Sequence, residues 1–390
     1  MSLAERQRQL DGLLAEHRSL WHPQPFRELQ PAWCETYPAL HAELNALSDD
    51  EVLRLNDDGA AAAALLARHQ PTLARLPEQA GLPSRIRRPL VPHGPHWCRD
   101  IPGRKREQIE SFAASAHGGD APVIDWCGGK GHLGRLLALQ WQTAVSTLEI
   151  DPLLCAEGEQ LAARQRLPQT FVEADALAVS GWPQAGQHAV ALHACGDLHR
   201  RLISHGVAQG VARFDVAPCC YHRGVGEAYQ AMSGDLKTRL TRDDVRLAVT
   251  ETVTASPRLA RQRDKEMAWK LGFDAYRRQV SGADTYKNFK PVPAAWFREH
   301  FDRFLGLMAE REGLPGDHRS AAEFERLGWA RQREVMRLSI VRHAFRRPME
   351  VWLALDLAVF LETRAYVVEL GVFCERHLTP RNLLISARRA

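Results

Sequence analysis

Long hydrophobic runs are absent from this chain of 390 residues. The most apolar stretch, residues 351–361, is interrupted by Asp356 and is shorter than the roughly 20 residues that a membrane-spanning helix needs. Residues 1–17 carry charges throughout and contain no apolar signal core. We therefore expect no membrane partner and a cytoplasmic location.

Cysteine and lysine are also scarce. The eight cysteines lack the dense, even spacing of a small secreted domain, which favours reduced thiols. Seven of the 51 basic residues are lysines and 44 are arginines. Codon usage in a GC-rich genome explains this bias, and recognition of phosphate or carboxylate by guanidinium groups is the alternative. The net charge of +4 permits a polyanionic partner without requiring one.

The remaining composition is that of a folded protein, with 45% apolar and 25% charged residues. Its length allows two or three domains. The local patterns divide the chain into five segments. We expect a helical N-terminal domain (1–82), a basic proline-rich connector with a helix (83–118), the first part of an α/β core (119–222), a helical insertion (223–345) and the last part of the core (346–390).

Short β-rich runs alternate with helical stretches after Pro122, which is the pattern of a parallel sheet built from βαβ units. We expect strands at residues 123–125, 144–149, 170–173, 188–193, 214–218, 365–374 and 383–387.

The strongest motif is DWCGGKGHLG, residues 125–134, directly after the first strand. Its glycines allow a tight turn and a close backbone approach to a ligand, and the following helix presents its positive N-terminus. Glu149 ends the second strand, where a carboxylate can accept both hydroxyls of a ribose. Asp175 follows the third strand, where an adenine amino group would need an acceptor. The cofactor-binding candidates are Asp125, Cys127, Gly128, Gly129, Gly131, Glu149, Asp151 and Asp175.

Two cofactors, NAD and S-adenosylmethionine, are compatible with such strand ends. Asp125, before the glycines, suits the positive amino group and sulfonium of S-adenosylmethionine better than a pyrophosphate. We therefore expect S-adenosylmethionine; the alternative is that these carboxylates only cap helices.

The motifs DWCGGKGHLGR, LHACGDL and PCCYH resemble the class I S-adenosylmethionine-dependent methyltransferases over residues 122–218 and again near residues 350–387. More narrowly, they are similar to the methyltransferase-like family that includes the eukaryotic ribosomal-RNA-adenine-dimethylase-domain-containing proteins. The glutathione-S-transferase-C-terminal-domain-containing methyltransferases and the tRNA 2′-O-methyltransferases with an H-x-C-G motif resemble the chain more distantly.

This resemblance implies an α/β, Rossmann-like sheet of seven strands with the last strand antiparallel. It implies that Asp125, Gly129 and Gly131 hold the methionine part of the cofactor. Glu149 would take the ribose hydroxyls, and Asp175 would lie beside the adenine. The resemblance leaves the role of the helical insertion open.

Methyl transfer is an in-line displacement, so the protein must align a nucleophile with the methyl group and handle its proton. Asp197 or a histidine could act as base or orient the acceptor, and Tyr221 could stack on a planar acceptor. The catalytic candidates at the ends of the fourth and fifth strands are His193, Asp197, Cys219, Cys220, Tyr221 and His222.

Other interpretations remain for the cysteines and for Lys130. Cys195, Cys219 and Cys220 could bind a metal with a histidine, but adjacent cysteines lack the spacing of zinc motifs, so we expect no metal. The Cys219–Cys220 pair could supply a covalent nucleophile of the kind that pyrimidine carbon-5 methyltransferases use, or the thiols could simply pack. Lys130 contacts either an acidic substrate group or only solvent.

RNA is the favoured acceptor, from the relatives and from four basic stretches that could line a phosphate track. These stretches are residues 85–88, 104–106, 258–265 and 277–278. A protein or small-molecule acceptor, or a non-catalytic protein that binds S-adenosylmethionine, is the alternative. The sequence does not indicate an oligomeric state.

Overall fold

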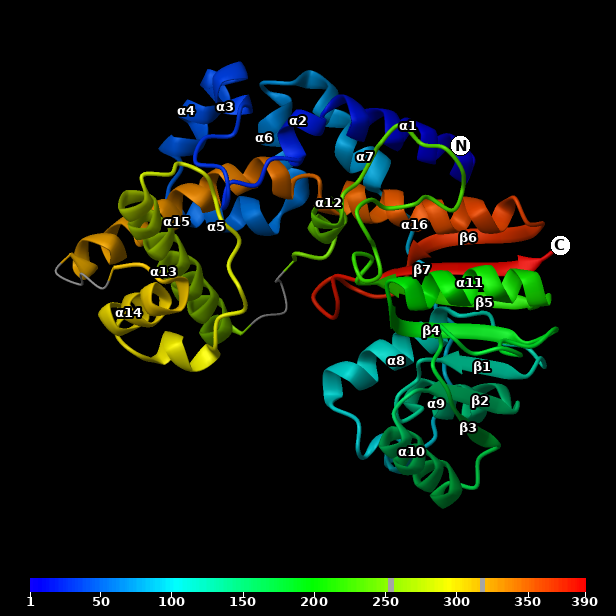
Figure 1. Cartoon of the computed structure of the whole chain (residues 1–390). Helices are drawn as coiled ribbons and strands as arrows, with labels where there is room; N and C mark the ends of the chain where they lie inside the picture. Colours follow the sequence, from blue (N-terminus) through cyan, green and yellow to red (C-terminus); the bar gives the residue numbers. More distant parts are fainter. Residues whose placement is uncertain (252–255, 316–319) are drawn as a thin grey trace. The chain divides into compact units, whose positions relative to one another are not determined.

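The computed structural model describes residues 1–251, 256–315 and 320–390. The chain forms two compact units, and each combines segments that are distant in the sequence. The first, called the sheet unit, comprises residues 1–16, 76–254 and 346–390. The second, called the helical unit, comprises residues 17–75 and 255–345. Figure 1 shows both units coloured along the sequence.

The sheet unit contains a seven-stranded sheet in the order β3-β2-β1-β4-β5-β7-β6. Strand β7 runs antiparallel to β5 and β6, and the other neighbours are parallel. The expected α/β fold with an antiparallel last strand is confirmed, and each strand end lies within two residues of its expected position. The strands are β1 (Val123–Trp126), β2 (Val145–Glu149), β3 (Gln169–Glu173), β4 (His188–Cys195), β5 (Arg213–Cys219), β6 (Tyr366–Val372) and β7 (Leu383–Arg389).

Helices join and cover the strands of the sheet unit. A core of buried side chains, including Phe112, Leu137 and Val190, joins α8 and α9 to the sheet. The helices are α1 (Leu3–Glu16), α7 (Leu76–Ala80), α8 (Gly103–Ser115), α9 (His132–Trp141), α10 (Pro152–Arg164), α11 (Asp197–Gln209), α12 (Arg242–Leu247) and α16 (Arg346–Glu362), with a 3-10 turn η2 (Pro95–Cys98). No helix among the described residues combines the length and the apolar content needed to cross a membrane.

The segment between β5 and α12 is irregular, whereas the sequence suggested helix after Tyr221. Asp356 of α16, which is fully buried, holds its middle. The Asp356 carboxylate accepts hydrogen bonds from Tyr229 Oη (2.7 Å), Met232 N (2.9 Å) and Ser233 N (2.8 Å). A buried carboxylate thus takes the backbone donors that a helix would otherwise satisfy internally.

Asp11 of α1 holds the end of the same segment. Its carboxylate accepts hydrogen bonds from Lys237 N (2.7 Å) and Thr238 N (3.0 Å), and from Trp352 Nε1 of α16 (3.0 Å). Helix α1 is therefore part of the sheet unit by hydrogen bonding as well as by packing.

The structure corrects the expected domain division. Residues 1–82 do not form one N-terminal domain, because α1 and α7 pack on α16 of the sheet unit. Residues 223–345 are likewise divided: α12 belongs to the sheet unit, while α13, α14 and α15 belong to the helical unit. An amphipathic pattern shows which face of a helix is buried, but it does not identify the partner of that face.

The helical unit is built around aromatic side chains, with Trp269, Phe273, Phe304 and Phe324 in one buried cluster. Ser48 starts α5 through a capping box with Glu51. The helices are α2 (Arg18–Trp21), α3 (Trp33–Thr36), α4 (Pro38–Ala46), α5 (Asp49–Asp57), α6 (Gly59–Ala67), α13 (Pro257–Ser281), α14 (Phe301–Glu312) and α15 (Ala321–His343), with 3-10 turns η1 (Pro71–Arg75) and η3 (Ala294–Arg298).

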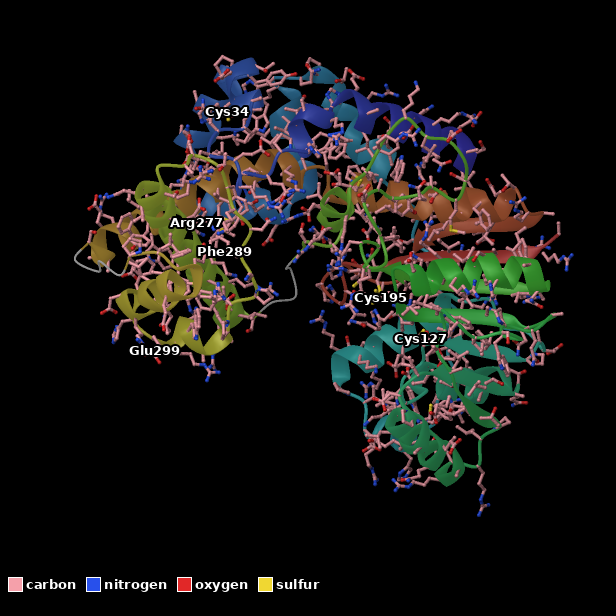
Figure 2. The ribbon with its side chains drawn as sticks, viewed as in Figure 1. Cys34, Cys127, Cys195, Arg277, Phe289 and Glu299 are labelled. Atoms are coloured by element: carbon pink, nitrogen blue, oxygen red, sulfur yellow. The ribbon has the colours of Figure 1, made fainter. Side chains whose placement is uncertain are left out.

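Several arginines of the expected phosphate track are paired within the protein. Arg277, labelled in Figure 2, is buried and ion-paired with Asp274. Arg278 also pairs with Asp274, and Arg85 pairs with Glu369. These arginines are therefore not available to a nucleic acid, because each would have to leave a carboxylate partner.

Candidate functional site

Strained backbone marks the carboxyl ends of three neighbouring strands. Cys127 follows β1, His193 lies near the end of β4, and Cys220 follows β5; their φ angles are 57°, 76° and 44°. Non-glycine residues adopt this left-handed region at a cost of roughly 1 to 3 kcal/mol each, and such residues cluster at functional sites. Figure 2 shows Cys127 and Cys195 at this edge of the sheet.

The glycines after β1 have two different functions. A Cβ on Gly128 would lie 2.4 Å from Asp125 Oδ2, and one on Gly131 would lie 2.3 Å from Gln169 Nε2. Internal packing therefore requires both glycines. A Cβ on Gly129 would meet nothing within 4 Å, although the φ of Gly129 is +60°. The backbone at Gly129 is thus open to the close approach of a ligand.

The Glu149 carboxylate is oriented by three backbone N–H groups. Its Oε2 accepts a hydrogen bond from Gly129 N (2.9 Å), and its Oε1 accepts from Ile150 N (2.9 Å) and Asp151 N (3.1 Å). Three of the four lone-pair sites of the carboxylate are thus occupied, and the remaining site, on Oε2, can accept a ribose hydroxyl. The half-buried Glu149 thus fits the ribose role and also ties β2 to the glycine loop.

Asp125 is only 1% exposed, and its Oδ2 accepts a hydrogen bond from Gly134 N (3.0 Å) at the start of α9. Burial raises the pKa of the Asp125 carboxyl to about 6, against the opposing effects of this hydrogen bond and of Lys105. A buried carboxylate of this kind gains from a bound positive group, such as the amino group of S-adenosylmethionine. Asp125, Gly129 and Glu149 together fit that cofactor.

The other two acidic candidates have local partners. Asp151 caps α10, where its Oδ1 accepts from Leu153 N (2.9 Å) and Leu154 N (3.4 Å). Asp175 is exposed, and its Oδ1 accepts from Leu177 N (2.9 Å). The capping alternative therefore holds for Asp151, while the adenine role of Asp175 stays a prediction.

Helix α8 contributes two residues that sequence reasoning missed. Gln108 Oε1 lies 3.0 Å from His193 Nε2, and Gln108 Nε2 donates to Leu378 O (2.9 Å) in the loop between β6 and β7. Lys105 is near enough to lower the pKa of Asp125. The basic run at residues 104–106 showed that this segment is positively charged, but no local pattern in the sequence indicates that α8 faces the strand ends.

Lys130, one of the seven lysines, forms an ion pair with Glu157 of α10. The pair ties the glycine loop to the helix that follows β2. Neither sequence interpretation, contact with an acidic substrate group or with solvent alone, included this internal partner.

Three cysteines lie together at the ends of β4 and β5. Cys195 and Cys219 are paired residues on the neighbouring strands, with their sulfur atoms 3.5 Å apart, and the Sγ atoms of Cys195, Cys219 and Cys220 all lie within 4.8 Å of one another. Hydrogen bonds from the other two thiols, with the charges of Arg223 and His222, hold the pKa of Cys220 far below its usual range. The ends of β4 and β5 thus bring thiols from two distant segments into one cluster.

The Tyr221 ring is not available for stacking. It is 1% exposed and packs edge-on against His199, with 5.4 Å between the ring centroids. Its hydroxyl has no hydrogen-bond partner in the described parts of the chain. This burial corrects the expectation that Tyr221 stacks on a planar acceptor.

Asp197 and His222 remain accessible beside the cluster. Asp197 begins α11, its side chain is 43% exposed, and Arg200 Nε lies 3.7 Å from its Oδ1. His222 is half-buried, and its pKa is lowered by burial and by the charges of Arg246, Arg242 and Arg223, against an opposing effect of Cys220. Both residues can therefore take part in proton transfer near the strand ends.

Comparison with known proteins gives one match that carries an argument. Residues 104–225 match the model of a methyltransferase domain family, and this segment contains the glycine loop, Glu149 and the three cysteines. Over these residues the chain is thus similar to a methyltransferase domain, and S-adenosylmethionine is its cofactor. A search of curated proteins found no match.

Solved structures resemble only part of the chain. A tRNA (uracil-54, C5)-methyltransferase from Pyrococcus abyssi is 15% identical with a TM-score of 0.24, over 28% of this chain and 27% of that enzyme. An rRNA methylase from Streptococcus thermophilus is 10% identical with a TM-score of 0.24, over 30% and 70% of the two chains. A TehB-like methyltransferase from Corynebacterium glutamicum is 17% identical with a TM-score of 0.24, over 35% and 78%. At such scores the likenesses carry no argument about the acceptor.

Proposed function

We propose that the sheet unit transfers the methyl group of S-adenosylmethionine to an acceptor carried by RNA. The observation that supports RNA is a group of exposed arginines beside His222. Arg223, Arg242 and Arg246 all act on the pKa of His222. All three are exposed, and within residues 1–251, 256–315 and 320–390 none has an acidic partner. Such unpaired guanidinium groups suit phosphates.

The cofactor residues follow from the fit described above. In this proposal Asp125 holds the amino group, Gly129 allows the backbone approach, and Glu149 holds the ribose. Asp175 is proposed beside the adenine. When bound, S-adenosylmethionine supplies a methyl group activated by its sulfonium.

The acceptor is proposed to lie at the ends of β4 and β5, where an open α/β sheet places its ligands. His193 is oriented by Gln108 through the 3.0 Å contact between Nε2 and Oε1. We assign His193, Asp197 or His222 the task of positioning the acceptor and taking its proton. Cys220, with its lowered pKa, is the alternative as a nucleophile, with Cys219 beside it.

The acceptor is tested with labelled S-adenosylmethionine and total RNA or total protein from the source cell. We expect label in RNA. The Arg242→Ala/Arg246→Ala double variant should lose most of this labelling, and the salt dependence of RNA binding should weaken by roughly one unit of log–log slope for each lost phosphate contact. Arg164→Ala/Arg166→Ala is the matched control, because these exposed arginines lie at the end of α10, outside the four basic stretches.

Other outcomes would select another function. Label in protein only would replace RNA by a protein acceptor. Label in neither fraction would favour a small-molecule acceptor or a protein that only binds S-adenosylmethionine. Calorimetric titration separates these cases from a wrong cofactor site: Glu149→Ala should abolish binding, while Glu173→Ala, an exposed carboxylate at the neighbouring strand end, should not.

A further inference from the structure

We infer that Cys195, Cys219 and Cys220 form a binding site for a thiophilic divalent cation, with zinc as the metal that this set of ligands favours. The inference does not depend on the identity of the methyl acceptor. It rests on the position of the three sulfur atoms, on the backbone that brings them together and on the weakness of their other contacts.

The spacing of the sulfur atoms suits a tetrahedral thiolate site. Zinc–sulfur bonds of about 2.3 Å place neighbouring sulfurs about 3.8 Å apart at tetrahedral angles. Cys195 Sγ and Cys219 Sγ are 3.5 Å apart, and no pair in the cluster exceeds 4.8 Å. Shifts of about 1 Å or less therefore convert this arrangement into one face of a zinc tetrahedron.

The backbone overcomes the usual objection to adjacent cysteines as ligands. In a regular strand Cys219 and Cys220 would point to opposite faces of the sheet. Strand β5 ends at Cys219, and the left-handed φ of 44° at Cys220 turns the chain there. An irregularity in the β4–β5 pairing between Leu192 and Cys195 brings Cys195 opposite Cys219. Both departures from regular strand geometry act to gather the thiols.

The competing contacts of the thiols are weak. Cys195 Sγ lies 3.5 Å from His193 O, and Cys219 Sγ lies 3.9 Å from Ala194 O. Thiols are poor hydrogen-bond donors, so a cation would displace little. Cys219 is 4% exposed, and Cys195 and Cys220 are half-buried, so one side of the cluster stays accessible.

Soft sulfur ligands in a tetrahedral arrangement select zinc over magnesium or calcium. Three protein ligands leave a fourth coordination position for water or for a small molecule, as in catalytic zinc sites. Among the described histidines, aspartates and glutamates, none joins this group within the same distance.

Cobalt is the probe for this site. Reduced protein, freed of metal with a chelator, is titrated with Co²⁺, and the sulfur-to-cobalt charge-transfer absorption is recorded. We expect saturation at one cobalt per chain and displacement by an equivalent of Zn²⁺. Metal analysis of protein purified without chelator should find zinc, and zinc should slow alkylation of the Cys195 and Cys219–Cys220 peptides.

The matched pair of variants is Cys220→Ser and Cys98→Ser, since Cys98 is a half-buried cysteine outside the cluster. Cys220→Ser should lower cobalt affinity at least about tenfold, because even residues that only support metal ligands have effects of that size. Cys98→Ser should titrate like the wild type. Thermal unfolding of both variants identifies any loss of binding that reflects misfolding, and Cys195→Ser then serves as the second test.

Three results would overturn the inference. The first is a reduced wild-type protein without charge-transfer absorption. The second is an unchanged titration in a folded Cys220→Ser or Cys195→Ser variant. The third is a Cys195–Cys219 disulfide that forms in air whether or not zinc is present, which would make the pair a redox couple instead of a metal site.

Discussion

At the scale of single residues, the site depends on groups whose surroundings oppose their usual behaviour. Burial raises the pKa of the Asp125 carboxyl from 3.8 to about 6. Its ionisation therefore lowers the stability of the folded protein without ligand. The protonated Asp125 carboxyl therefore contributes about 3 kcal/mol to the free energy of unfolding. This contribution is fully present below pH 3.8 and is lost as the pH rises through about 6.

The pKa of Asp125 predicts a pH dependence for cofactor binding. If the ionised carboxylate pairs with the amino group of S-adenosylmethionine, affinity should rise about tenfold per pH unit below pH 6 and level off above it. Calorimetric titrations between about pH 5 and 8 check this. Asp125→Asn should bind weakly with no such slope; a wild-type affinity that is flat across this range would contradict the role of Asp125.

The glycine loop gives a matched pair of substitutions. Gly129→Ala places a methyl group in open space at a positive φ, so we expect a stability loss of about 1 kcal/mol and a large loss of cofactor affinity. In Gly131→Ala the new methyl group would collide with Gln169 and Phe171, so the free energy of unfolding should fall by about 2 kcal/mol or more. Denaturant unfolding and calorimetry separate the two effects. Equal effects of both variants on stability and affinity would refute the distinction.

At the scale of elements, the sequence predicted the strands well and the helix partners poorly. Local apolar runs after Pro122 indicated every strand, because a buried parallel strand leaves a local signal. The Asp125 and Glu149 strand ends were likewise visible as motifs. The grouping of Cys195, Cys219 and Cys220 was visible as well, from their places at the ends of the fourth and fifth strands. The contact of Gln108 with His193 was not, since it depends on tertiary pairing of distant segments.

The irregular segment between β5 and α12 provides the prediction at this scale. Asp356→Ala would leave Tyr229 Oη, Met232 N and Ser233 N without their buried acceptor. Unfolding free energy should fall by about 3 kcal/mol or more. Chemical denaturation measures the change, with Glu362→Ala near the end of the same helix as control. A loss below about 1 kcal/mol would mean that solvent replaces these hydrogen bonds.

At the scale of the whole molecule, neither unit is one continuous stretch of chain. The sequence could not reveal this, because helices of the N-terminal region look alike whether they pack on the sheet unit or on α15. Leu10, Leu13 and Leu14 of α1 are almost completely buried, and Asp11 is bonded to Thr238. The first 16 residues thus belong to the sheet unit.

Deleting residues 1–16 tests this assignment. The three leucines contribute roughly 2 kcal/mol each by burial, and Asp11 adds its hydrogen bonds, so the truncated protein should lose most of its stability and its binding of S-adenosylmethionine. Circular dichroism and calorimetry report the two losses, with the exposed substitution Arg8→Ala as control. A truncated protein that binds the cofactor normally would contradict the assignment.

The position of β7 has a consequence for synthesis on the ribosome. This strand lies between β5 and β6 in the sheet but is made after every residue of the helical unit. Until β7 emerges, β5 is an edge strand with unpaired backbone groups, and such edges invite association with other chains. The nascent chain therefore has a long interval in which its first five strands can pair but β5 still lacks its neighbour β7.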